Sequence, residues 1–139
     1  MTRPWLPPFE ALDRAHLGGR LELDPSAVIG RGVSIDLSAD VTIGAGAIIG
    51  EQTLILTHEH EHPGCPLLNT SVTATPLAIG AHAFIGARTV VLAAVRQIGA
   101  GAIIGAGSIL TRDVPALELW AGNPAHLIRR LDRVTDPPR

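Results

Sequence analysis

Aliphatic residues recur every six positions along most of this 139-residue chain. They fall in four in-register runs: Leu23, Ile29 and Ile35; Ile43, Ile49 and Ile55; Ile79, Ile85 and Val91; Ile98, Ile104 and Leu110. An amphipathic helix repeats at 3.6 residues and a half-buried strand at 2, so neither element alone explains a period of six. The period predicts a short strand and a tight turn, repeated, with three units closing one coil of about 18 residues. Successive coils are expected to stack at the spacing of neighbouring strands, about 4.8 Å.

The composition agrees with a narrow interior and excludes several classes of function. Hydrophobic residues make up 46% of the chain but aromatic residues only 3%, as expected if the interior holds aliphatic side chains and little else. The net charge of −2 argues against a dedicated nucleic-acid binder, which would carry a basic excess. No apolar run approaches the roughly 18 residues that span a membrane. A single cysteine fits a reducing, cytoplasmic location.

Glycines and breaks in the repeat divide the chain. A glycine often follows the aliphatic residue, and we expect it to let the backbone turn there. Extra residues are expected near 38–40 and 96–97, and the polar, aperiodic stretch 58–77 is predicted to be an extruded loop. The predicted organisation is a capping segment over 1–20, a β-helix domain over 21–115 containing that loop, and a turn, helix and tail over 116–139.

Helices are predicted only at the two ends of the chain. The stretch FEALDRAHL in the capping segment reads as one short helix. Near the other end, Asn123 is expected to cap a helix that has Pro124 at its first position. Aliphatic residues at Leu127, Ile128 and Leu131 would continue that helix.

The motifs IGAHAFIGARTVVL, IGAGAIIGAGSILTRDVP and AGNPAHLIRRL resemble those of the hexapeptide-repeat acyltransferases. The resemblance covers roughly residues 21–133, and the closest members are the maltose, galactoside and nodulation sugar O-acetyltransferases. It implies an all-β fold, a left-handed parallel β-helix of hexapeptide repeats with an extruded loop and a short C-terminal α-helix. It also implies acetyl transfer from acetyl-CoA to a sugar hydroxyl, in a homotrimer whose active site lies at the subunit interface, without a metal.

The resemblance places the catalytic histidine five residues after the last aliphatic residue of a coil, which is His60 when counted from Ile55. Imidazole can accept the proton of an attacking alcohol near neutral pH. His58 is the second candidate, because the run HEHEH allows a slip of two residues. Asp36 stands where a glycine usually follows the aliphatic residue, and either assists the histidine or caps a turn. The sugar-contacting asparagine of the family falls at Gly30 here, which leaves the acceptor open.

The resemblance also predicts the residues that would bind coenzyme A. Phe84 takes the place of the family's usual tryptophan beside the thioester, and small residues would let the pantetheine arm approach the backbone. Cations would bind the phosphates, with Arg112 where lysine is common, His126 where arginine or lysine is common, and Arg129 in the terminal motif. The predicted contacts are Phe84, Ala87, Ala106, Thr111, Arg112, His126 and Arg129.

Two other functions remain open on the sequence. A metal site like that of the γ-type carbonic anhydrases could use His58, His60, His62, Cys65 and His82, although the spacing in HEHEH does not match that family. A catalytically silent scaffold is the third interpretation. An amine acceptor would be a variant of the first, and the acyl chain length is not set by the sequence.

Overall fold

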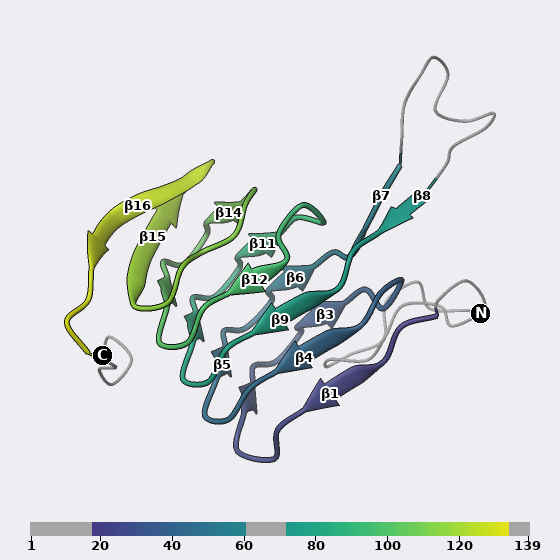
Figure 1. Cartoon of the computed structure of the whole chain (residues 1–139), viewed down its shortest axis with the longest axis horizontal. Coiled ribbons are helices and arrows are strands. Elements are labelled where there is room, and N and C mark those ends of the chain that lie inside the picture. The colour runs from purple at the N-terminus through teal and green to yellow at the C-terminus, as the bar shows by residue number, and fades with distance from the viewer. Residues whose placement is uncertain (1–17, 61–71, 134–139) are drawn as a thin grey trace.

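The computed structural model describes residues 18–60 and 72–133, and within these residues the chain forms strands and no helix. Three parallel sheets form the sides of a coil that winds along one axis (Figure 1). The first sheet contains β1 (Leu21–Leu23), β4 (Val41–Ile43), β9 (Leu77–Ile79) and β12 (Gln97–Ile98). The second contains β2 (Val28–Ile29), β5 (Ile48–Ile49), β10 (Phe84–Ile85), β13 (Ile103–Ile104), β15 (Glu118–Gly122) and β16 (Ala125–Arg130). The third contains β3 (Ser34–Ile35), β6 (Leu54–Ile55), β11 (Val90–Val91) and β14 (Ile109–Leu110). Each coil supplies one strand to each sheet, so the predicted β-helix is confirmed.

The six-residue aliphatic positions form the interior of the coil. Ile29, Ile49, Ile85 and Ile104 are register partners in successive strands of the second sheet. From Ile35 onward, every predicted inward aliphatic residue is at most 2% exposed. Leu23 and Ile29, both in the first coil, are only half-buried. Burial of each such side chain contributes roughly 1.5–3 kcal/mol, so the stack of aliphatic residues is the main source of stability.

The glycines that follow the aliphatic residues have a different role from the one expected. They do not adopt positive φ; the positive φ values lie two residues later, at Gly32, Gly46, Gly101 and Gly107. A Cβ added at Gly86 would lie 2.4 Å from the backbone nitrogen of Ala106 on the next coil. These glycines are therefore required by the close stacking of backbones, and the turn itself is made by the residue two positions further on.

All the irregularities of the repeat gather at one corner, between the third sheet and the first. The extra residues near 38–40 lie between β3 and β4, and those near 96–97 lie between β11 and β12. The predicted loop 58–77 leaves the same corner. Its two ends pair as an antiparallel hairpin of β7 (His58–His60) and β8 (Val72–Ala74), which projects from the coil (Figure 1). The sequence 61–71 between them lies outside the described residues.

The predicted C-terminal helix is wrong. The segment forms an antiparallel hairpin of β15 and β16, with a cis Asn123–Pro124 bond in its turn. β15 continues the second sheet as a parallel neighbour of β13, and its free edge then offers backbone groups that β16 pairs. Leu127 and Ile128 are 41% and 52% exposed, so their spacing did not mark a buried helical face.

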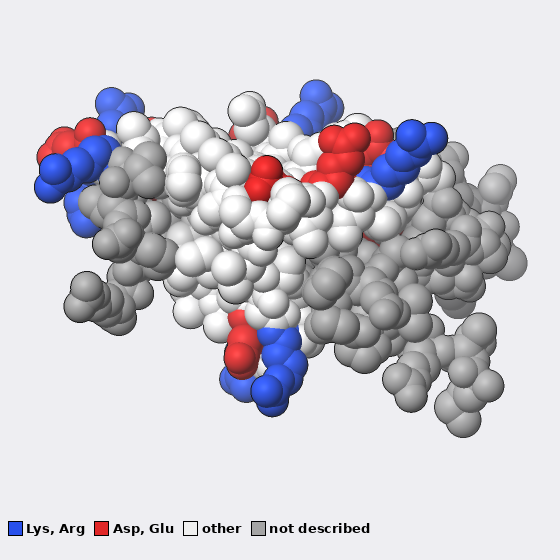
Figure 2. Space-filling model, turned by 90° about the horizontal axis from the view of Figure 1, so that it is seen from below, with Lys and Arg blue, Asp and Glu red and all other residues white. Residues whose placement is uncertain are grey.

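The ends of the chain add little to this description. The predicted helix FEALDRAHL and most of the capping segment 1–20 lie outside the described residues. Among the described residues no helix has the length and apolar character needed to cross a membrane. The face shown in Figure 2 is largely uncharged, and its Arg, Asp and Glu side chains lie mostly at the rim.

Candidate active site

Asp36 is a fully buried carboxylate at the irregular corner, directly after β3. Its Oδ1 accepts hydrogen bonds from the Ser38 N–H at 2.9 Å and the Ser38 Oγ at 2.7 Å. Its Oδ2 accepts from the N–H groups of Thr57 and His58, at 2.9 and 3.1 Å, and contacts His58 Nδ1 at 2.5 Å. The carboxylate therefore ties the first coil to the point where β6 ends and the β7–β8 hairpin begins.

These contacts fix the ionised form of Asp36. Burial alone would raise its pKa, but the hydrogen bonds donated by the Thr57 N–H, Ser38 and His58 outweigh burial and hold the pKa below its ordinary value. The carboxylate thus binds the ring of His58 and also accepts from the N–H and hydroxyl of Ser38, two residues further along the chain.

His58 is oriented by this carboxylate. Because an ionised carboxylate only accepts, His58 Nδ1 carries the proton and donates it to Asp36, with Ser38 Oγ a second neighbour at 3.1 Å. The Nε2 atom is then the unprotonated nitrogen of the neutral ring. The side chain of His58 is 27% exposed, so the imidazole is partly open to the surface.

His60 lies two residues further along β7, on the same face of the strand. Its side chain is exposed, and its ring meets that of His58 edge to face with centroids 5.1 Å apart. The structure therefore brings together three predicted catalytic residues, Asp36, His58 and His60, at the root of one hairpin.

Two of the three predicted contacts of the pantetheine arm, Ala87 and Ala106, lie at another corner, between the second sheet and the third, whereas Thr111 does not. Ala87 follows β10 and Ala106 follows β13, on successive coils, and the Gly107 N–H donates to the Ala87 carbonyl at 2.8 Å. Both alanines are exposed. Phe84 points outward from β10, with Ile48 and Ile103 as its register partners. Within one chain these residues do not share the corner of Asp36 and His58.

The third predicted pantetheine contact, Thr111, lies beside Arg112, and the predicted phosphate-binding residues Arg112, His126 and Arg129 divide between two faces. Thr111 and Arg112 follow β14, at the same corner as the histidines but two coils further along. His126 and Arg129 lie on β16 opposite Ala121 and Leu119, whereas Arg112 lies over Trp120. Because side chains alternate along β15, the pair on β16 occupies the opposite face of the hairpin from Arg112. Figure 2 shows Arg side chains at the end of the molecule where β15 and β16 lie.

Glu118 and Trp120 form a buried polar contact that sequence reasoning missed. Trp120 is 7% exposed, and its indole N–H donates to Glu118 Oε2 at 2.8 Å. The Arg112 guanidinium carbon lies 5.1 Å from the centroid of the Trp120 ring. The spacing of Glu118 and Trp120, two residues apart, would have placed both on one face of a strand, had a strand been predicted there.

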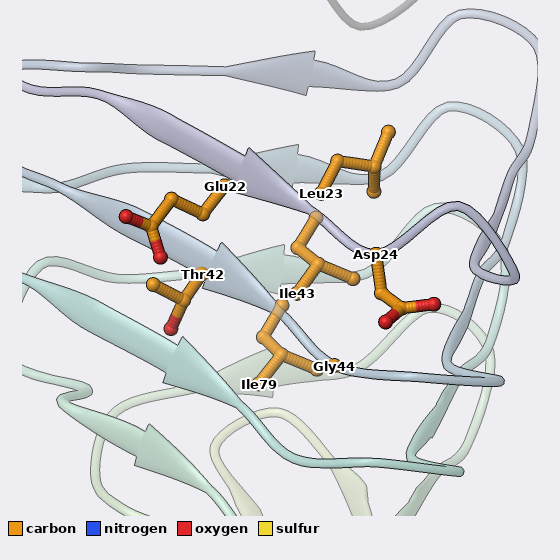
Figure 3. A pocket seen from close by; sticks show the side chains of 7 residues that line it. All are labelled: Glu22, Leu23, Asp24, Thr42, Ile43, Gly44 and Ile79. Carbon is orange, nitrogen blue, oxygen red and sulfur yellow. The ribbon is translucent and has the colours of Figure 1, made fainter.

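A pocket on the first sheet contains none of the predicted residues. Figure 3 shows its lining, with Glu22 and Thr42 side by side on neighbouring strands. The Ser26 hydroxyl and N–H hold the pKa of Asp24, at its rim, below the ordinary value. The lining residues are Glu22, Leu23, Asp24, Thr42, Ile43, Gly44 and Ile79. This pocket lies at the carboxyl ends of β1 and β4, away from the histidine corner.

The alternative interpretation was a metal site. In the described ranges 18–60 and 72–133, no three histidine, cysteine or acidic side chains lie so that they could hold an ion. His82 lies in the turn after β9, at a different corner from His58 and His60. His62 and Cys65 fall outside the described residues.

Comparisons with known proteins place the chain among acetyltransferases, although no protein-family model matches it. It is 37% identical over 114 residues to serine acetyltransferase 4 of Arabidopsis thaliana, covering 81% of this chain and 30% of that protein. It is 31% identical over 110 residues to the putative colanic acid biosynthesis acetyltransferase WcaF of Escherichia coli K12, covering 79% and 58%. Among solved structures, a galactoside acetyltransferase in complex with coenzyme A is 28% identical, with a TM-score of 0.66 over 84% of this chain and 60% of that one.

The chain thus spans 30% and 58% of the length of these two curated relatives. The matches agree with the six-residue repeat, the coil of three parallel sheets and the terminal motif. In sequence and in fold this chain is thus similar to the hexapeptide-repeat acetyltransferases, a family of left-handed parallel β-helices.

Proposed function

We propose that this chain is an acetyl-CoA-dependent O-acetyltransferase that transfers an acetyl group to a hydroxyl of a sugar or glycan precursor. The observation that carries the proposal is the imidazole pair at the root of the β7–β8 hairpin, anchored on a buried carboxylate. An alcohol is a poor nucleophile at neutral pH, and an oriented imidazole supplies the base that it needs. We propose acetyl as the transferred acyl group because the matched relatives are named acetyltransferases.

The reaction needs one proton acceptor and no covalent enzyme intermediate. The hydroxyl oxygen attacks the thioester carbonyl carbon while its proton passes to the imidazole. The carbon–sulfur bond then breaks, and the imidazolium returns the proton to the leaving sulfur. The products are an acetyl ester and the free thiol. Backbone N–H groups are the natural donors for the oxyanion formed on the way.

We assign the base to His60 and the anchoring role to His58. His60 is exposed, stands at the outer end of β7 and occupies the position that the family resemblance predicts. The N–H and Nδ1 of His58 are both bound to Asp36, which also binds the N–H of Thr57. That carboxylate therefore fixes the position of His58 at the root of the hairpin. The ring of His58 in turn packs edge to face against the ring of His60. His58 is the alternative base, because Asp36 binds its Nδ1 and in the neutral ring Nε2 is then the nitrogen that can accept a proton.

The acetyl donor is proposed to be acetyl-CoA, as the complex of the related galactoside acetyltransferase with coenzyme A suggests. The exposed alanines Ala87 and Ala106 present little bulk, so an extended arm can approach their backbone. Phe84 would lie beside the thioester end. Thr111 is proposed as a further contact of the arm, and Arg112, His126 and Arg129 are proposed to bind the phosphates.

The acceptor is proposed to be a sugar because the names of two matched proteins, a colanic acid biosynthesis acetyltransferase and a galactoside acetyltransferase, point to saccharides. Gly30 leaves this chain without a side-chain amide at the position where the resemblance predicts a sugar contact. The acceptor contacts are therefore expected to differ from those of the family.

We propose that the protein is a homotrimer whose sites form between subunits. The histidine corner and the Ala87–Ala106 corner are separate edges of one coil, so a site that uses both must combine two chains. The outward face of the second sheet also carries a continuous apolar ladder, and that of the third sheet is mostly apolar. The residues of the ladder, in register, are Val28, Ile48, Phe84, Ile103 and Leu119. Each chain therefore has two apolar faces. If one face packs against the other face of the next chain, the copies can close into a ring.

We place the protein in the cytoplasm. The chain contains one cysteine in 139 residues, which suits a reducing compartment.

The first test is calorimetric titration with acetyl-CoA, followed by transfer assays on a panel of sugars with serine as the comparison acceptor. Binding near one acetyl-CoA per chain and ester formation on a sugar are expected. No binding at millimolar acetyl-CoA would overturn the proposal, and transfer to serine alone would overturn the acceptor class.

Single histidine variants test the base. His60→Ala is expected to lower kcat at least ~100-fold, the usual scale for a lost general base, with little change in acetyl-CoA affinity. His82→Ala is the matched control, since this exposed histidine lies at another corner and should leave kcat unchanged. If His58→Ala abolishes transfer while His60→Ala does not, His58 is the base.

A further inference from the structure

Arg112 is an exposed cation held from one side only. Its guanidinium carbon lies 5.1 Å from the centre of the Trp120 ring. Within residues 18–60 and 72–133, the ion pairs join His58 to Asp36 and Arg130 to Glu118, and none includes Arg112. The N–H groups of Arg112 are therefore not engaged by a carboxylate of the described chain, although a guanidinium commonly pairs with one.

The indole beneath Arg112 is fixed by the fold. Trp120 is 7% exposed and stands in register with Ile104 at the end of the second sheet, so its ring packs on the last full coil. Its N–H is bound to Glu118, which is itself 8% exposed. A ring that is packed and hydrogen-bonded cannot turn, so its face offers a constant surface to the guanidinium.

The two carboxylate oxygens of Glu118 contact groups other than Arg112. Its Oε2 accepts from the indole of Trp120, and its Oε1 lies 3.5 Å from Arg130 Nε. Because the carboxylate is balanced by Arg130, it orients the indole without competing for the guanidinium of Arg112. The two arginines thus flank one buried Glu118–Trp120 pair.

We infer that Glu118 and Trp120 are positioning residues that hold the Arg112 guanidinium ready for a phosphate group of the acetyl donor. This inference rests on the proposed function for the identity of the donor, and on the contacts above for the roles of the two residues. The ligand class is a phosphate ester, which matches the planar, multiply donating guanidinium.

Steady-state kinetics with two donors test the positioning role. Arg112→Ala is expected to raise KM for acetyl-CoA about tenfold, with kcat unchanged and little effect on KM for 3′-dephospho-acetyl-CoA. Trp120→Leu should produce the same pattern at about two- to fivefold, the scale of an exposed cation–π contact. Arg31→Ala, an exposed arginine in the turn after β2, is the control and should change neither KM.

Conservative variants keep the test decisive if Trp120→Leu does not fold. Trp120→Phe retains an aromatic face, so its KM for acetyl-CoA should stay close to that of the parent. Glu118→Gln keeps an acceptor for the indole N–H and should also stay near the parent KM. Equal increases in KM for both donors, or no increase with Trp120→Leu, would overturn the inference.

Direct titration separates this inference from the proposed function. Adenosine 3′,5′-bisphosphate is the probe, because it carries phosphate groups without the acyl arm. If the parent protein binds the probe and Arg112→Ala and Trp120→Leu weaken that binding, the inference stands even where no acetyl transfer is found. Unchanged binding of the probe in both variants would overturn it.

Discussion

At the residue scale, Asp36 links two coils through one carboxylate that accepts five contacts. Both oxygens face only donors, so the isosteric amide of Asp36→Asn must point an N–H₂ at another N–H or O–H. We expect this variant to destabilise the fold by about 2–3 kcal/mol, the scale of a hydrogen-bonded charged group. Urea unfolding of the parent and the variant measures the difference. Ser38→Ala, which removes one donor and leaves the carboxylate intact, should cost less.

The same residue predicts the response to acid. The folded pKa of Asp36 lies below its ordinary value, so its contribution is fully present above that ordinary value, near pH 4, and is lost as the pH falls through the folded pKa. Thermal unfolding from pH 7 to pH 2 should therefore show a steeper loss of Tm below about pH 4 in the parent than in Asp36→Asn. Parallel curves for the two proteins would remove Asp36 from the acid response.

At the scale of the elements, the glycines near each turn have two different roles. One lets the backbones of successive coils stack closely, and the other adopts a positive φ. A Cβ at Gly86 would meet backbone atoms of the next coil at 2.4–2.8 Å, whereas one at Gly107 would meet nothing within 4 Å. Gly86→Ala is expected to lower the free energy of unfolding by about 3 kcal/mol, at the upper end of overpacking costs. Gly107→Ala should cost about 1 kcal/mol, because only its positive φ opposes a side chain, and Gln52 and Arg88 already adopt positive φ at equivalent turns. Urea denaturation ranks the two, and equal losses would contradict the stacking argument.

At the scale of the whole molecule, the apolar ladder on the second sheet predicts how copies associate. Ile48→Asp would place a charge between Val28 and Phe84, and burial of an unpaired charge in an interface is costly. We expect that variant to sediment as a monomer and to lose most of its transferase activity. Thr42→Asp, an outward position on the first sheet, is the control and should remain a trimer. Light scattering that gives a monomer for the parent protein would contradict the proposed assembly.

The sequence alone determined the coil, because the six-residue period is a local property that repeats in every coil. One buried aliphatic residue in each six-residue unit marks one side of the coil, and the same pattern located the breaks in the repeat, which the structure gathers at one corner. The candidate histidines His60 and His58 came from the family resemblance, which counts five residues from Ile55, the last aliphatic residue of the second coil.

Only the tertiary structure decided the long-range partners. Whether Asp36 caps a turn or holds a histidine depends on His58, which is 22 residues away and reaches it by coil stacking. The Asn123–Pro124 pair suited a helix start, but β15 presented an edge to be paired, and that edge exists only after the preceding coils have stacked. Local patterns therefore predict the repeated element, while contacts between coils select the ends of the fold and the partners of each polar side chain.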